Sequence, residues 1–218
     1  MMDHNHDLFL RQQIIDTAQE LAARGLSPGL SGNISARVDE GLLITPSAMD
    51  YSDLLPDDIV LVPHDGDVPP GQRKPSNETP FHRAIFAAFP DAHAVLHCHS
   101  PKATALACLR KPIPAFHYMV AVAGGDDIRV ADYFTPASHQ LAEASVKALS
   151  GRKACLLANH GQVAFGASLA EGLALACEVE TLAAMYLDAL AAGEPQLLSA
   201  AEMAEVRELF KSYRPSRS

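Results

Sequence analysis

The sequence predicts a single α/β domain whose central, mostly antiparallel sheet is flanked by helices. Two observations indicate this fold class: strand patterns alternate with helical patterns along the chain, and a hairpin signal at Asp39-Glu40-Gly41 joins two of the first strands. No internal repeat or linker interrupts the 218 residues, which are enough for one domain with a full core. We therefore treat residues 1–218 as one domain.

The first expected element is an amphipathic helix over residues 8–24. Leu10, Ile14, Ala18 and Leu21 recur at helical spacing, and Gly25 ends the pattern. The polar residues 1–7 before it are expected to fray.

The remaining strands and helices are distinguished by the spacing of their apolar residues and by the turn residues at their ends. Strands are expected where short apolar or alternating runs lie between turn residues, at 34–38, 42–45, 58–62, 94–97, 154–158 and 162–165. Helices are expected where apolar residues recur three and four apart, at 79–89, 102–109, 136–149, 168–192 and 200–210. Ser168 is a capping residue for the longest helix, and Gly193 ends it.

Composition is typical of a globular protein of the cytoplasm. Hydrophobic residues make up 48% and charged residues 20%, and no apolar run approaches the ~20 residues of a membrane span. The N-terminus lacks the pattern of a secretory signal, and the 4 cysteines form no Cys-x-x-Cys pair. A net charge of −9 argues against a nucleic-acid partner, so a small anionic substrate would need local donors.

The tripeptide His97-Cys98-His99 ends an apolar strand pattern. Residues two apart in a strand point to the same side, so both imidazoles face one point and Cys98 faces away. A third histidine, His160, ends another strand pattern in Asn159-His160-Gly161. Imidazole is a preferred ligand of Zn²⁺, and three protein ligands leave a position open for water or substrate. The sequence therefore predicts a catalytic metal site.

Glu78 lies where the loop Pro75-Ser76-Asn77 turns into a helix. A carboxylate in a first helical turn often serves only to favour the helix N-terminus. Near a metal held by three neutral histidines it has a second use, as a ligand that can leave to accept a proton. His82, four residues later, reads as a surface or outer contact of Glu78.

Six motifs in order resemble the class II aldolase and adducin-head family over nearly the whole chain, from the first helix to Tyr213. The motifs are Ser31-Gly32-Asn33-Ile34-Ser35, Ile44-Thr45-Pro46, Pro75-Ser76-Asn77-Glu78, His97-Cys98-His99, His117-Tyr118-Met119 and Asn159-His160-Gly161. The resemblance implies a sheet of about nine strands and a homotetramer with active sites at subunit interfaces.

The resemblance also implies roles for individual residues. His97, His99 and His160, with Glu78, would hold Zn²⁺ or another divalent transition metal, and Glu78 would be the catalytic acid/base. Tyr118 would reach the site from a neighbouring subunit as a proton donor, and Tyr213 in the tail 211–218 would close over the site. Substrate and phosphate would be bound by Gly32, Asn33, Ser47, Ala48, Ser76 and Asn77.

The activity implied is reversible cleavage of a small ketose 1-phosphate, similar to L-fuculose 1-phosphate, to dihydroxyacetone phosphate and an aldehyde such as lactaldehyde. The metal would stabilise the enediolate that this cleavage leaves. Two alternatives remain open. One is a decarboxylase or an aldolase for unphosphorylated sugars on the same scaffold, and the other is a non-catalytic interaction module resembling the adducin head.

Several positions depart from the family pattern around the substrate. Leu30 and Asn77 stand where hydroxyl residues are typical, Ser47-Ala48 replaces Thr-Gly, and Pro136 replaces an aromatic residue. These differences leave the metal chemistry intact and the substrate open, while glutamate at Glu78, rather than aspartate, favours an aldolase over an epimerase.

Overall fold

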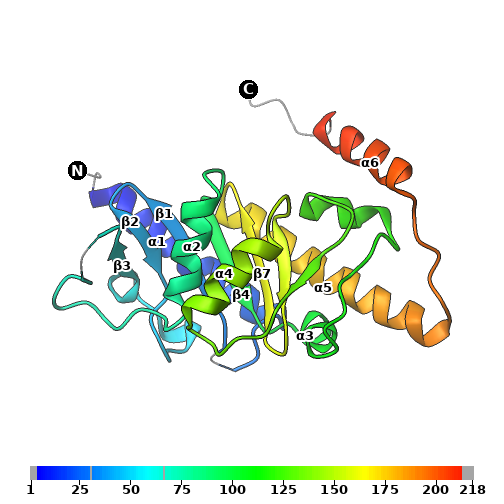
Figure 1. The fold of residues 1–218 in the computed structure, drawn as a ribbon. Helices are drawn as coiled ribbons and strands as arrows, with labels where there is room; N and C mark the ends of the chain where they lie inside the picture. The colour runs from blue at the N-terminus through cyan, green and yellow to red at the C-terminus, as the bar shows by residue number, and fades with distance from the viewer. Residues whose placement is uncertain (1–3, 30, 66, 213–218) are drawn as a thin grey trace.

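The computed structural model, which describes residues 4–29, 31–65 and 67–212, contains a mixed sheet of seven strands in the order β3-β2-β1-β4-β7-β6-β5 (Figure 1). Five neighbouring pairs are antiparallel, and β5 pairs with β6 in parallel. The strands are β1 (Asn33–Val38), β2 (Gly41–Ile44), β3 (Val60–Pro63), β4 (Ala94–Cys98), β5 (Arg129–Ala131), β6 (Ala154–Leu157) and β7 (Gly161–Gly166).

The α/β prediction is confirmed and most pairings are antiparallel as expected, but the expected number of about nine strands is wrong. The described residues form seven strands, and the sheet is mixed. Two further extended pairings remain isolated bridges, Pro46 with Pro75 and Ile113 with Ile128. Proline cannot donate to a ladder, and Pro112 and Pro114 flank the second bridge, so neither pairing extends into a strand.

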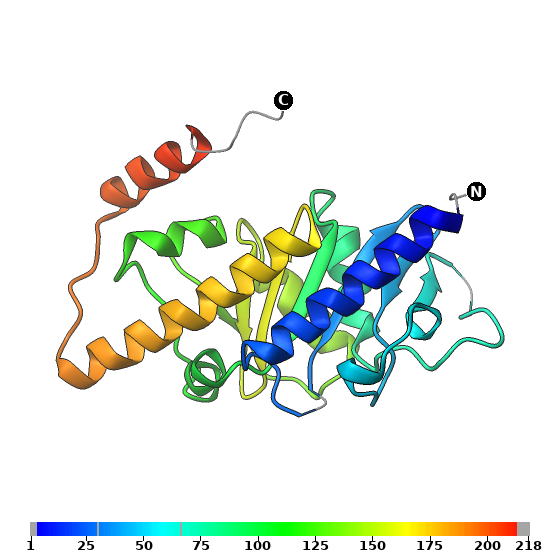
Figure 2. The ribbon, with the colours of Figure 1, turned by 180° about the vertical axis from the view of Figure 1, so that it is seen from behind.

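Helices cover both faces of the sheet. The helices α1 (His4–Ala23) and α5 (Leu169–Ala192) lie side by side on one face (Figure 2), and α2 (Thr79–Ala88) and α4 (His139–Ala148) lie together on the other (Figure 1). The other helical segments are α3 (Pro101–Cys108), α6 (Ala200–Ser212) and the 3₁₀ turns η1 (Tyr51–Asp53), η2 (Pro56–Asp58) and η3 (Tyr118–Ala123).

The two apolar layers determine which way the residues of β4 point. Val95 packs in the layer under α2 and α4, whereas Leu96 and Cys98 pack in the layer against α1. His97 follows the alternation and lies on the α2 side, where its ring meets the ring of Phe81 edge-on at 5.4 Å between centroids. The prediction that Cys98 faces away from the histidines is therefore confirmed.

Several boundaries differ from those expected. The helix α1 begins at His4, so residues 4–7 are helical rather than frayed, and Asp7 accepts a hydrogen bond from Arg11 at 2.9 Å. Strand β3 begins at Val60 because residues 56–58 form η2. The sequence patterns did not reveal β5 or η3, since a three-residue strand and a 3₁₀ turn carry little periodicity.

No helix within the described part of the chain has the length and apolarity needed to cross a membrane.

Candidate metal centre and active site

The three predicted histidine ligands lie together at one end of β4 and β7. His97 is in β4, His99 follows that strand, and His160 lies in the turn between β6 and β7. Antiparallel pairing places Cys98 opposite Gln162, so this turn lies beside the end of β4. The ligand nitrogens of the three rings all lie within 4.8 Å of one another. The sequence prediction of one histidine cluster is confirmed.

The surroundings of the cluster leave ring nitrogens facing one another. His97 Nδ1 donates to the carbonyl of Gln162 at 2.9 Å, which leaves Nε2 as the free lone pair, 3.1 Å from His99 Nε2. Burial, together with the nearby His97, lowers the pKa of His99 and that of His160 to about 4. Imidazole nitrogens that approach one another this closely suit a cation between them, so the cluster fits a divalent transition metal.

Glu78 reaches the same point from the N-terminus of α2. Its Oε2 lies 3.2 Å from His97 Nε2, and its Oε1 lies 3.3 Å from His160 Nε2. Burial opposes ionisation of Glu78, but contacts with His97, a hydrogen bond from Asn33 and the nearby His160 outweigh it, and its pKa lies well below the usual range. Oε1 is buried and makes no hydrogen bond to a described residue, so it is available to a metal or a substrate proton.

Two glycines allow the site segments to approach closely. A Cβ on Gly161 would lie 2.5 Å from the Cys98 carbonyl oxygen and 2.9 Å from His99 Cδ2. At Gly32, with φ of +95°, a Cβ would lie 2.8 Å from the carbonyl oxygen of His97. A side chain would clash at both positions, so each requires glycine. Gly32 also requires glycine because its positive φ is strained for other residues. These glycines therefore set the spacing of the loops around the histidines.

A cavity of about 310 Å³ opens beside the cluster. All six residues predicted to bind substrate or phosphate line it, and so do Glu78, His99, His160 and Pro136. The loops on its wall are joined by backbone hydrogen bonds from Ser47 to Lys74 at 2.9 Å and from Ser76 to Thr45 at 3.2 Å. No lysine or arginine is among its described lining residues, so neutral groups would have to bind an anion there.

The structure does not bring Tyr118 to this cavity. Tyr118 lies in η3, is 48% exposed and is absent from the described lining of the cavity. Its ring lies 6.3 Å from that of Phe210 in α6. Leu30 and Tyr213 lie outside the described residues, so their expected positions stay predictions.

His82 contributes to the site in a way that its sequence position did not indicate. It is not a surface residue, because its side chain is fully buried. Its Nε2 lies 2.5 Å from Asn33 Oδ1, and Asn33 Nδ2 donates to Glu78 Oε2 at 2.9 Å. Burial lowers the pKa of His82 to about 3, so the ring is neutral. The only indication of this contact in the sequence is that His82 lies four residues after Glu78, on the same side of a helix.

Comparison with known proteins extends this picture beyond the site. Residues 12–187 match the family model of the class II aldolase and adducin N-terminal domain. The chain belongs to this family. It is 50% identical over 204 residues to the 5-methylthioribulose-1-phosphate/5-deoxyribulose-1-phosphate aldolase of Rhodospirillum rubrum, covering 94% of this chain and 92% of that protein.

Other relatives agree with this assignment. Identity is 44% over 205 residues to the L-fuculose phosphate aldolase of Escherichia coli strain K12, covering 94% of this chain and 95% of that one. The solved structure of an L-fuculose 1-phosphate aldolase superposes with a TM-score of 0.90 at 39% identity, covering 97% and 98% of the two chains. This chain is thus an enzyme of the lyase class, and the alternative of a non-catalytic interaction module is wrong.

Proposed function

We propose that this class II aldolase reversibly cleaves a small ketose 1-phosphate to dihydroxyacetone phosphate and an aldehyde. The observation that carries the proposal is the meeting of three imidazoles with a carboxylate whose Oε1 accepts no hydrogen bond from a described residue, beside one cavity. Relatives at 50% and 44% identity are named for aldol cleavage of phosphorylated ketoses, which supports the reaction class.

His97, His99 and His160 would hold a divalent cation, with Zn²⁺ the ion best suited to three imidazoles and an open position. When bound, such a cation supplies a positive centre that stabilises the negative charge left next to the ketone as the carbon–carbon bond breaks. Glu78 is close enough to complete the coordination before substrate arrives, because its oxygens lie 3.2 and 3.3 Å from two of the ring nitrogens.

Glu78 is proposed as the acid/base of the reaction. In the synthetic direction its carboxylate takes a proton from the carbon beside the ketone of dihydroxyacetone phosphate. The electron pair released there forms the bond to the aldehyde carbon, and Tyr118 donates a proton to the aldehyde oxygen. Cleavage runs through the same transfers in reverse. The low pKa of Glu78 keeps its carboxylate ionised at neutral pH.

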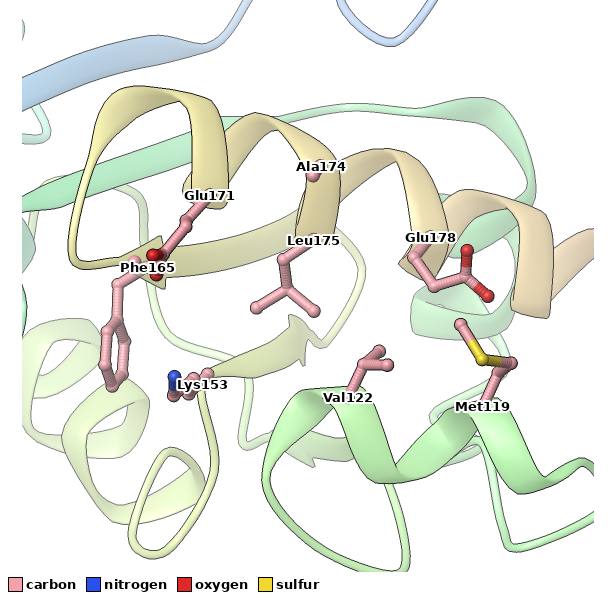
Figure 3. A pocket seen from close by; sticks show the side chains of 9 residues that line it. Met119, Val122, Lys153, Phe165, Glu171, Ala174, Leu175 and Glu178 are labelled. Atoms are coloured by element: carbon pink, nitrogen blue, oxygen red, sulfur yellow. The ribbon is translucent and has the colours of Figure 1, made fainter. Parts of the chain in front are cut away.

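Tyr118 would act in the site of a neighbouring subunit, in a homotetramer. Two features support this arrangement: the ring is exposed and does not line the described part of its own chain's cavity, and the next residue, Met119, lines a partly apolar hollow (Figure 3). The hollow has a volume of about 320 Å³ and lies between η3 and α5, where Met119, Val122 and Leu175 line it. A neighbouring subunit that covered this surface would bury apolar side chains next to Tyr118.

The substrate phosphate would be bound by neutral donors of the cavity wall, chiefly the side chains of Ser47, Ser76 and Asn77. The alternatives to L-fuculose 1-phosphate are 5-methylthioribulose 1-phosphate and 5-deoxyribulose 1-phosphate, since the relative with 50% identity is named for them. Pro136 on the wall leaves the aldehyde end without the aromatic residue expected there.

Product analysis of the zinc-loaded protein with these three ketose phosphates tests the proposal. We expect dihydroxyacetone phosphate and the matching aldehyde, with the substrates ranked by kcat/KM. An unphosphorylated ketose serves as the control and should be cleaved far more slowly. Release of carbon dioxide from a keto acid phosphate, without dihydroxyacetone phosphate from any ketose, would contradict the proposal and support the decarboxylase alternative.

A further inference from the structure

We propose that His82 is a positioning residue that orients Glu78 through Asn33. This inference rests on the proposed acid/base role of Glu78. It starts from a line of hydrogen bonds that crosses from β1 to α2 beneath the cavity. Ser35 Oγ lies 2.6 Å from His82 Nδ1, His82 Nε2 lies 2.5 Å from Asn33 Oδ1, and Asn33 Nδ2 lies 2.9 Å from Glu78 Oε2.

The chemistry of the last member sets the direction of the whole line. An ionised carboxylate only accepts, so Asn33 must turn its NH₂ group toward Glu78 and its oxygen toward His82. His82 must then carry its proton on Nε2 to donate to that oxygen. Its Nδ1 is left as an acceptor, and the Ser35 hydroxyl donates to it. Each bond therefore donates in the same direction, toward Glu78.

Because these side chains are buried, each depends on its protein partner for its hydrogen bond. His82 and Ser35 are fully buried and Asn33 is 4% exposed, so water does not readily replace a missing partner. The His82 ring also stacks on that of Phe81, with 4.5 Å between centroids, which restricts its orientation. Without a donor at His82, the buried oxygen of Asn33 would lose its hydrogen bond, and the amide would no longer be held at both ends. Glu78 would then lose a fixed hydrogen bond on the oxygen nearest His97.

The geometry separates this role from substrate binding and metal binding. No hydrogen bond joins His82 to His97, His99 or His160 among the described residues, and His82 does not line the described part of the cavity. Its removal should therefore lower kcat more than it raises KM, and it should leave the metal content unchanged.

Two substitutions in the zinc-loaded, full-length protein test this role. His82→Leu removes the donor and should lower kcat by about 10- to 100-fold, the range seen when outer hydrogen-bond partners of a site are removed, while KM changes by less than about threefold. His82→Gln keeps an N–H that can reach Asn33 and should recover most of the loss. Ser35→Ala should have a smaller effect. Ser145→Ala, which removes another fully buried hydroxyl in α4, is the matched control and should have none.

A measurement on the wild-type protein does not depend on turnover. Nitrogen-15 NMR of the zinc-loaded protein should show His82 neutral with its proton on Nε2. A proton on Nδ1, or full kcat in a folded His82→Leu protein, would overturn the inference. If the wild-type protein cleaved no ketose phosphate, the proposed function would fail, whereas the NMR result would still decide the direction of the hydrogen bonds.

Discussion

At the scale of single residues, the clearest strain beside the site is at Ala48. Its φ of 55° lies in the left-handed region, which costs a residue with a Cβ ~1–2 kcal/mol, and it lies on the cavity wall. The rest of the loop holds it there, because Ser47 donates to the Lys74 carbonyl.

Ala48→Gly should therefore stabilise the protein. Part of the relief is lost to the greater freedom of glycine in the unfolded chain, so we expect a net gain of ~0.5–1 kcal/mol in the free energy of unfolding. Urea unfolding measures it. Gly29→Ala is the reverse control, because Gly29 has φ of +69° with nothing within 4 Å of its Cβ position, and it should destabilise by a similar amount. A destabilising Ala48→Gly would show that the strain is absent.

Asn33 shows how a residue can be predicted at the site for only part of its role. The resemblance placed it among the substrate-binding residues, and it does line the cavity. Its side-chain amide, however, is shared between His82 and Glu78. Sequence spacing cannot show this, since the three residues come together only when β1 packs against α2.

At the scale of elements, α6 supports the segment that carries Tyr118. Met203 of α6 is fully buried in the apolar cluster that includes η3, Phe210 lies against Tyr118, and Arg207 forms an ion pair with Asp126 just after η3. The packing of α6 against η3 is separate from the sheet (Figure 1). If Tyr118 acts as proposed, the position of η3 depends on this helix.

Met203→Ala should loosen α6. Loss of a buried methionine costs ~2–5 kcal/mol, and α6 packs chiefly against η3, so the loss should appear first as local opening of α6. Hydrogen exchange should rise over residues 200–212 while the sheet stays protected, and kcat should fall. Leu197→Ala, at a 58% exposed position, is the control and should change neither. Unchanged exchange in Met203→Ala would mean that α6 does not depend on this contact.

Helices and strands were predictable from the sequence where a periodic apolar pattern ends at a turn or capping residue. The strand that contains His97, the helix that begins after Glu78 and the helix capped by Ser168 all combine an apolar pattern with a turn or capping signal. The strand count was overestimated because it came from the resemblance, whereas prolines in this chain limit two pairings to single bridges. The 3₁₀ turn η3 has no comparable signal, so the position of Tyr118 was not predictable from the chain's own pattern.

At the scale of the whole molecule, the buried imidazoles link folding to pH. The pKa of His82 lies at about 3 and those of His99 and His160 at about 4 in the folded protein, against 6.5 for an unperturbed histidine. Below pH 6.5 the unfolded chain therefore takes up protons that the folded chain does not. This contribution to stability is complete above that pH and is lost progressively as the pH falls toward 4.

Thermal unfolding of the metal-free protein should accordingly show a Tm that falls steadily between about pH 7 and pH 5. His82→Gln should make the fall shallower, because it removes one of the groups that titrate only on unfolding. His64→Gln, at an exposed histidine, should leave the slope unchanged. A Tm independent of pH across this range would contradict the burial of these rings as neutral groups.

The central claim is that three histidines and Glu78 form a metal-dependent aldolase site, and one assay tests it most directly. Release of dihydroxyacetone phosphate from a ketose 1-phosphate is followed before chelation, after chelation and after zinc is restored, in wild-type and Glu78→Gln proteins. We expect chelation to abolish release and zinc to restore it in the wild type, and Glu78→Gln to bind zinc yet lose ~10²–10⁴-fold in kcat. Release that survives complete removal of metal, or a zinc-loaded Glu78→Gln protein with wild-type turnover, would contradict the account.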